Sequence, residues 1–112
     1  MLIPRIKPIT QKRLGQIERA RGLASYTTWR KSVLDRDGFA CQYPGCGSKE
    51  HLQVHHIRKF ADNRHLRTTR FNGITLCKKH HDNIFHREHL YELLFFNIVK
   101  GNERKLKDGN IN

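Results

Sequence analysis

The chain has few of the residues that cross-link a small protein: its 112 residues include only three cysteines. Three cysteines cannot all pair within one chain, so a complete disulfide framework is excluded. No apolar run approaches the roughly 18 residues that a membrane span needs, and none follows Met1 as it does in a secretory signal peptide. We therefore expect a cytoplasmic protein with no membrane partner, where cysteines near histidines more often bind metal than form disulfides.

Acidic residues are also scarce. Ten Asp and Glu stand against 22 Lys and Arg, which gives a formal net charge of +12. Such a surface attracts polyanions, and nucleic acid is the commonest polyanion that proteins meet. A solubilising surface or a ribosomal-type RNA binder would have the same composition. The charge therefore predicts a nucleic-acid partner and leaves its kind open.

The first third of the sequence predicts an arm and two short helices. Residues 1–10 contain two prolines and no helical period, so an extended arm is expected. The charged segment 11–21 predicts a helix that ends at Gly22. A second helix is expected to begin at Thr28 and to stop at Gly38, in the left-handed conformation.

The remainder predicts strands and one longer helix. Strands are expected over 52–57 and 74–76, and a helix from about 78 to 99 that Gly101 ends. The polar segment 101–112 has nothing to bury and is expected to fray. This pattern gives an α+β class with an arm and short helix over 1–27, one domain over 28–100 and a polar tail.

Two short-spaced pairs of metal-binding residues lie far apart in the chain. Cys41 and Cys46 bracket a turn with Pro and Gly, and Cys77 and His80 are separated by two lysines. This spacing is typical of a structural zinc site, in which three thiolates and one imidazole leave no open position. The alternatives are that His81 replaces His80 as the fourth ligand, or that the cysteines are ordinary small apolar residues.

A second set of polar residues is interleaved with these ligands. His55 and His56 are on the first predicted strand, Asn72 precedes the second, and His81 follows the last zinc ligand. The ordered set resembles the HNH endonucleases, over residues 28–86 or about half of the chain. The matching fragments are Trp29-Arg30, Arg36-Asp37-Gly38, Cys41 with Cys46, Val54-His55-His56-Ile57, Asn72 to Cys77, and His80-His81. Small phage-associated nicking endonucleases are the most similar members of that family.

The resemblance implies a ββα-metal (His-Me finger) core, stabilised by zinc and flanked by N- and C-terminal helices, that nicks double-stranded DNA. By that resemblance His56 is the general base, His55 and His81 bind the catalytic divalent ion, and Asn72 orients the loop of the base or reaches the metal. Many relatives have Asp where this chain has His55. An imidazole shifts the preference from Mg²⁺ toward Mn²⁺, with Ni²⁺ or Co²⁺ as substitutes. His86 departs from the spacing of the relatives and is either an auxiliary ligand or a DNA contact.

Adjacent residues on a regular strand point to opposite faces, yet His55 and His56 should both approach one phosphate. The strand is therefore expected to end or bend there, with Asn72 holding the following loop by hydrogen bonds. The alternative is that Asn72-Gly73 forms a simple turn.

The loop between His56 and Asn72 is strongly basic, and Asp62 is its only acid. We expect it to bind DNA phosphates, although a solvated loop without function has the same composition. Its proposed DNA-binding residues are Arg58, Lys59, Arg64, Arg67 and Arg70. No small-molecule substrate is expected, and the oligomeric state stays open. A non-catalytic zinc module that binds nucleic acid is the main alternative to the enzyme.

Overall fold

The structure, a computed structural model, describes residues 10–58 and 64–109. Its elements in chain order are helix α1 (Gln11–Arg36), strand β1 (Leu52–His56), the 3-10 turns η1 (Arg64–Arg67) and η2 (Arg70–Asn72), strand β2 (Gly73–Cys77), helix α2 (Lys78–Asn83) and helix α3 (Glu88–Gly109). The small α+β architecture that the sequence predicts is confirmed. The predicted arm over residues 1–9 lies outside the described residues. Within the described part, no helix combines the length and the apolar character that crossing a bilayer requires.

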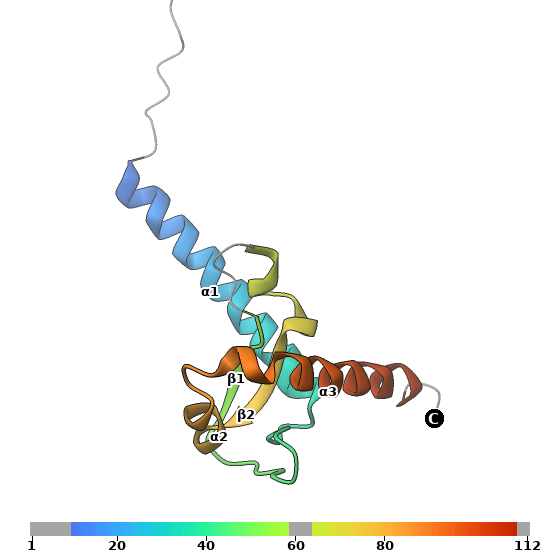
Figure 1. Ribbon diagram of the computed structural model, residues 1–112. Coiled ribbons are helices and arrows are strands. Elements are labelled where there is room, and N and C mark those ends of the chain that lie inside the picture. The colour runs from blue at the N-terminus through green and yellow to red at the C-terminus, as the bar shows by residue number, and fades with distance from the viewer. Residues whose placement is uncertain (1–9, 59–63, 110–112) are drawn as a thin grey trace, which may run out of the picture.

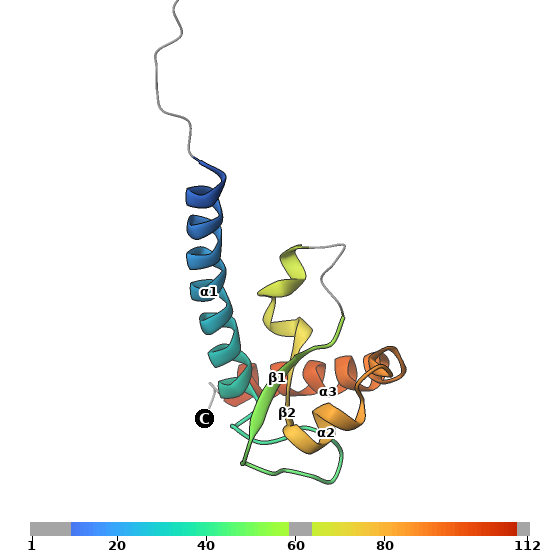
Figure 2. The same cartoon turned by 90° about the vertical axis from the view of Figure 1, so that its left-hand side faces the viewer.

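Helix α1 is continuous, and its N-terminal half projects away from the rest of the fold (Figures 1 and 2). It begins after Thr10, whose hydroxyl accepts a hydrogen bond from the backbone N–H of Arg13 at 3.1 Å. The predicted break at Gly22 is wrong, because one glycine inside a helix costs only about 1 kcal/mol. The predicted stop is confirmed: Gly38 follows the helix with a φ of 67°.

Strands β1 and β2 form an antiparallel pair in which His55 lies opposite Ile74 and His56 opposite Gly73. Side chains alternate between the two faces of this sheet. One face packs against Trp29 and Val33 of α1. The opposite face packs against α2 and α3; its buried cluster comprises Cys41, Ile57, Ile74, Leu76, Cys77, Ile84, Phe95 and Val99.

Gly73 is placed where α1 crosses the sheet. A Cβ atom at this position would lie 2.6 Å from Cγ2 of Val33 and 2.7 Å from Cζ2 of Trp29. Its backbone is extended, with a φ of −117°. Gly73 is therefore required by the close approach of the helix rather than by the turn that the Asn72-Gly73 pair suggested.

The single helix expected over 78–99 is wrong, because the chain forms two helices there. Helix α2 ends at Asn83, and its last turn is closed by the N–H of Ile84, which is fully buried. The chain then turns through His86, whose φ is 68°, and α3 begins at Glu88. This turn lets α3 pack back across the sheet (Figure 1).

Helix α3 also continues beyond Gly101 to Gly109, so the predicted helix end and the frayed segment are wrong for residues 101–109. The side-chain amide of Asn102 donates hydrogen bonds to Asp37 and Gln42, each at 2.9 Å. Glu103 forms an ion pair with Arg70 at 2.7 Å. These contacts hold the end of the helix against the body of the protein.

A buried ion pair connects the helices with β2. The guanidinium of Arg36 binds the carboxylate of Asp37 at 2.8 Å, and neither side chain is exposed. Arg36 also donates to the carbonyl oxygens of Arg70 (2.7 Å) and Gly73 (2.6 Å), while Asp37 accepts from the N–H of Thr75. Breaking a buried pair on one side costs about 3–5 kcal/mol, so this pair fixes the entry into β2.

Candidate metal centre and histidine site

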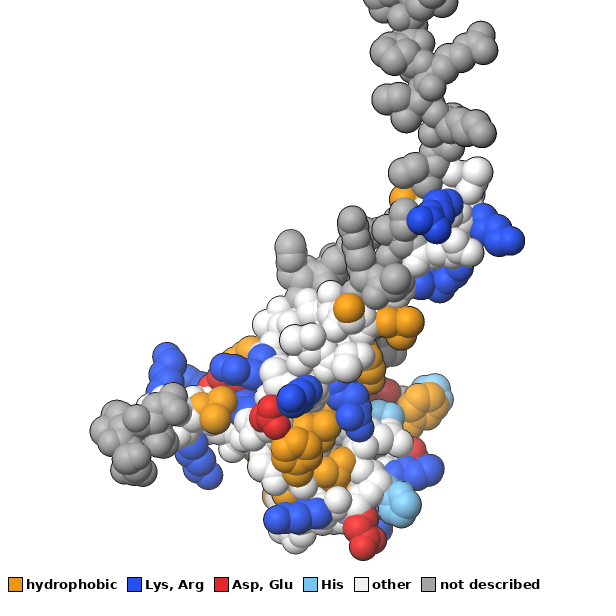
Figure 3. Space-filling model, turned by 180° about the vertical axis from the view of Figure 1, so that it is seen from behind, with side chains coloured by type: hydrophobic (Ala, Val, Ile, Leu, Met, Phe, Trp, Pro, Cys, Tyr) orange, Lys and Arg blue, Asp and Glu red, His pale blue; other side chains and the backbone are white. Residues whose placement is uncertain are grey.

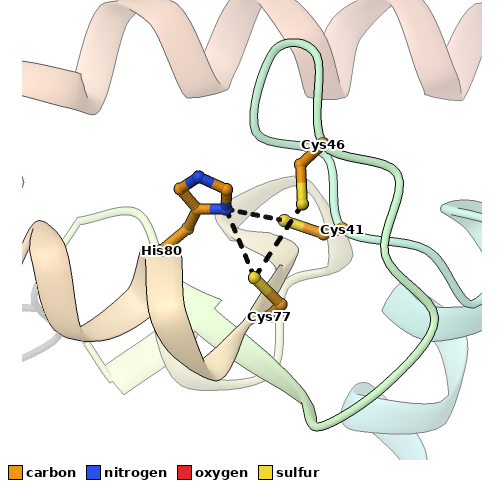
Figure 4. Close-up of side chains that lie close together, drawn as sticks. All are labelled: Cys41, Cys46, Cys77 and His80. Carbon is orange, nitrogen blue, oxygen red and sulfur yellow. Dashed lines mark hydrogen bonds between the residues drawn. The ribbon is translucent and has the colours of Figure 1, made fainter.

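The four predicted zinc ligands converge on one point (Figure 4). The chain brings them there from the loop after α1, the end of β2 and the first turn of α2. The sulfur atoms of Cys41, Cys46 and Cys77 and a ring nitrogen of His80 all lie within 4.8 Å of one another. Among the described residues, this is the only group of three or more such side chains that is close enough to hold one ion.

The spacing of these atoms fits a tetrahedral ion. Sγ of Cys46 lies 3.9 Å from Sγ of Cys77, and Nδ1 of His80 lies 3.2 Å from Sγ of Cys77 and 3.7 Å from Sγ of Cys41. Zn–S bonds of about 2.3 Å in a tetrahedron separate two sulfurs by about 3.8 Å. The group is therefore compatible with zinc, and the alternative of three unrelated cysteines does not account for this convergence.

The His80 ring is oriented by stacking on Tyr43, with ring centroids 4.1 Å apart and planes 4° apart. Nδ1, rather than Nε2, is the nitrogen that faces the sulfurs. His81, the alternative fourth ligand, lies outside the group and is directed toward His55 instead.

Burial raises the pKa of the Cys41 thiol to about 11. Burial acts in the same direction on Cys77, but a backbone hydrogen bond from His80, side-chain hydrogen bonds with Cys41 and Cys46 and a backbone hydrogen bond from Lys79 together outweigh it and lower that pKa. A bound cation favours thiolates, and the cost of deprotonating Cys41 would be met by metal binding.

His55 projects from β1 into the face that α2 and α3 cover. Its side chain is 7% exposed, and its ring lies 5.5 Å from the ring of His81 and 5.9 Å from that of Phe95. Nε2 is buried and has no hydrogen-bond partner among the described residues. The pKa of His55 is lowered to about 4, chiefly by burial and also by the nearby His81, while Glu88 opposes the shift.

A buried nitrogen without a partner is uncommon in folded proteins. A neutral imidazole can place such a lone pair on a metal ion, and His81 lies beside it. Glu88, in the first turn of α3, interacts electrostatically with His55 and adds a negative charge to this side of the sheet. The sequence pattern did not identify Glu88, because the helix boundary that places it there was not predicted.

His56 lies on the opposite face of the sheet, against α1. Its ring stacks on Trp29 with centroids 4.1 Å apart and planes 10° apart. Nε2 lies 3.0 Å from the carbonyl oxygen of Arg67. A carbonyl oxygen only accepts, so Nε2 carries the hydrogen and the basic lone pair of the neutral ring is on Nδ1. Burial also lowers the pKa of His56.

Asn72 holds the loop that follows β1 by hydrogen bonds, as expected. His55 and His56 nevertheless stay on opposite faces of the sheet, so the expected approach of both rings to one point is not seen. Its Oδ1 accepts from the N–H of Arg58 at 2.9 Å, and its Nδ2 donates to the carbonyls of Arg58 and Leu66, each at 3.0 Å. Strand β1 ends at His56, directly before this contact. Asn72 was expected either to orient this loop or to reach the metal, and all three of these side-chain hydrogen bonds are made to the loop.

The basic loop is less free to bind phosphate than its sequence suggests. Arg58 binds Glu92 of α3, with Nε to Oε1 at 2.8 Å, and Arg70 binds Glu103. The carbonyl of Arg67 holds the His56 ring. Lys59 and the side chain of Arg64 lie outside the described residues. Arg58 and Arg70 remain largely solvent-exposed despite their ion pairs.

His86, predicted to be either an auxiliary ligand or a DNA contact, is exposed and packs against the ring of Phe85 with centroids 4.1 Å apart. Within the described part of the chain, His86 is not a member of the group formed by Cys41, Cys46, Cys77 and His80.

Comparison of the chain with protein families, with curated proteins and with solved structures gives no match.

Proposed function

We propose that this protein is a metal-dependent DNA endonuclease of the HNH type, which nicks one strand by hydrolysing a phosphodiester bond. The observation that carries the proposal is the buried Nε2 of His55 beside His81, for which the described part of the chain offers no hydrogen-bond partner. In His56, the next residue along β1, Nε2 donates a hydrogen bond to the carbonyl of Arg67, which puts the basic lone pair of the neutral ring on Nδ1. A metal ligand and a base on adjacent strand residues, with a second ligand on the following helix, are what the HNH resemblance implies.

In this proposal the two strands and α2 form a ββα-metal core around two separate metal sites. Zinc bound by Cys41, Cys46, Cys77 and His80 is structural, because a closed tetrahedral set leaves no position for substrate. Zinc there joins the loop after α1 to β2 and α2, and so fixes the sheet that presents the histidines.

His55 and His81 would hold a catalytic Mn²⁺ or Mg²⁺, with Ni²⁺ or Co²⁺ as substitutes, and imidazole ligands favour Mn²⁺ over Mg²⁺. Such an ion supplies charge stabilisation at the phosphate and at the leaving 3′ oxygen. Nδ1 of His56 takes the proton of the attacking water, which is a task for a neutral imidazole. Trp29 and the carbonyl of Arg67 hold this ring in one orientation, and Asn72 fixes the loop from which that carbonyl comes.

The net charge of +12 supports a nucleic-acid substrate, since phosphate contacts by Lys and Arg supply most of the non-specific affinity for nucleic acid. That the nucleic acid is double-stranded DNA rests on the HNH resemblance. Arg58, Arg67 and Arg70, together with Lys59 and Arg64, remain the proposed contacts of the loop. Glu92 and Glu103 would compete with phosphate for Arg58 and Arg70, which lowers the expected contribution of these two arginines.

A plasmid-nicking assay tests the proposal. Supercoiled plasmid is incubated with the protein and Mn²⁺, Mg²⁺, Ni²⁺ or Co²⁺, and the ends of the products are sequenced. We expect nicked circles with Mn²⁺ at least as fast as with Mg²⁺, and none with His56→Ala, which should still bind DNA. His89→Ala, an exposed histidine on α3, is the matched control and should nick normally. DNA binding without nicking in any of the four metals would instead support the non-catalytic zinc module.

A further inference from the structure

The C-terminal half of α3 carries a basic face that the sequence pattern treated as a frayed tail. Lys100, Arg104 and Lys107 are spaced four and three residues apart, so they share one side of the helix. Together with Phe71 and Glu103 they line a groove of about 270 Å³. Lys and Arg side chains are visible along this end of the helix in Figure 3, at the left.

The positive charge of this groove is not neutralised by its neighbours. Among the described residues, none of Lys100, Arg104 and Lys107 forms an ion pair. The one acid of the groove, Glu103, is bound through both carboxylate oxygens by Arg70 and also accepts from Arg36. Three positive side chains therefore face solvent together, and the acid between them is already paired.

Opposite the basic side chains, the groove has an apolar wall formed by Phe71. Phe71 in η2 stacks on Phe96 of α3, with ring centroids 5.5 Å apart and planes 13° apart. Its side chain is 43% exposed. Arg36 and Asn72 hold η2 in place by hydrogen bonds, so the position of Phe71 relative to the basic face of α3 is fixed.

We propose that this groove, termed here the α3 groove, binds the sugar–phosphate backbone of the DNA duplex outside the cleavage site. The helix rises about 1.5 Å per residue, so the three cations span about 10 Å, over which one strand presents about three phosphates. Lys100 lies twelve residues after Glu88, or about 18 Å along α3, so the contact is made by DNA that flanks the cut. The identity of the partner rests on the proposed function.

The test is the salt dependence of duplex binding, measured in a His56→Ala background so that no strand is cut. The variant carries Lys100→Gln, Arg104→Gln and Lys107→Gln, which keep helix-forming side chains of similar length. We expect the slope of log K against log salt to become shallower by about three. If binding at 1 M salt is unchanged, a slope change of this size weakens binding on the order of 1000-fold at about 0.1 M salt.

The matched control removes the same charge elsewhere, with Lys12→Gln, Lys31→Gln and Lys49→Gln. Lys12 and Lys31 are at exposed positions on α1, and Lys49 is exposed in the loop between α1 and β1. The control should change the slope by less than one. Equal changes in the two variants would overturn the α3 groove as a specific contact. Far-ultraviolet circular dichroism and zinc content establish that both variants are folded, because a loss of fold would weaken binding for another reason.

Failure of this inference is distinct from failure of the proposed function. If the wild-type protein nicks plasmid but the groove variant keeps the wild-type salt slope, the α3 groove is wrong and the enzyme stands. If the groove variant shows the expected shallower salt slope but the wild-type protein nicks nothing in any metal, the α3 groove stands and the proposed enzyme activity is wrong.

Discussion

The ring of His56 stacks on the indole of Trp29, with centroids 4.1 Å apart and planes 10° apart. The same indole donates a hydrogen bond through Nε1 to the carbonyl of Thr69 at 2.9 Å. Trp29 therefore touches the proposed base on one side and the segment leading to Asn72 on the other. Through the buried side chain of Trp29, helix α1 thus positions both the His56 ring and the segment before Asn72.

This relationship gives the first prediction. Trp29→Leu removes the stacking surface and the Nε1 donor, so we expect the free energy of unfolding to fall by about 3 kcal/mol. At a temperature where the variant is folded, the nicking rate should fall at least about tenfold, because a misplaced base loses its geometry with the water. DNA affinity should change little. Tyr26→Phe, on the same helix, is the control, and a proportionate loss of rate and affinity in Trp29→Leu would count against the positioning role.

The second prediction concerns Gly73, where an added methyl group would clash with α1. Gly73→Ala should destabilise the protein by about 1–3 kcal/mol, as over-packing does. Gly22→Ala is the matched control, since nothing lies within 4 Å of a Cβ there and the helix gains about 1 kcal/mol from the better helix former. Urea unfolding measures both. A stable Gly73→Ala protein would show that α1 does not pack against β2 as described.

The third prediction concerns the metal ligands. We expect one zinc ion per chain, and removal by a strong chelator should abolish the cooperative thermal transition, because metal binding and folding are coupled in small domains. Cys46→Ser should behave like the chelated protein, whereas Ser48→Ala, a half-buried neighbour outside the group of four, should keep its zinc. Zinc content and circular dichroism provide the measurements. A chelated protein that still unfolds cooperatively would show that the four side chains do not stabilise the fold through an ion.

The fourth prediction separates the loop contact of Asn72 from DNA binding. Asn72→Ala removes three side-chain hydrogen bonds and leaves the N–H and carbonyl of Arg58 unpaired by this side chain, so unfolding should become easier by about 2–4 kcal/mol. Under conditions where the variant is folded, turnover should fall far more than DNA affinity. Asn97→Ala, at an exposed position on α3, should leave both unchanged. Equal losses of turnover and affinity in Asn72→Ala would argue that Asn72 acts only through stability.

Some of this could be predicted from the sequence, because the relevant signals are local. The spacing of Cys41 and Cys46, and of Cys77 and His80, predicts a metal group since each pair fits one turn. The end of α1 at a left-handed Gly38 could be predicted because glycine has no Cβ and adopts positive φ without strain. Asn72 was predicted to hold the loop, because adjacent residues of a regular strand point to opposite faces and the two histidines were expected to approach one phosphate.

The rest depends on contacts between distant parts of the chain. Gly22 and Gly101 lie inside helices, because a cost of about 1 kcal/mol each is small beside tertiary packing. The anchoring of α3 through Asn102 joins residues more than sixty positions apart in the sequence. Likewise, Glu92 and Glu103 neutralise Arg58 and Arg70 from more than thirty residues away, which no local charge pattern reveals.

The central claim is that one divalent ion binds between His55 and His81. Anomalous diffraction from crystals soaked in manganese tests it most directly. We predict a manganese peak within bonding distance of Nε2 of His55 and of a ring nitrogen of His81, separate from the zinc peak at the cysteines. No manganese between the two rings, with His55 and His81 directed away from each other, would contradict the enzyme.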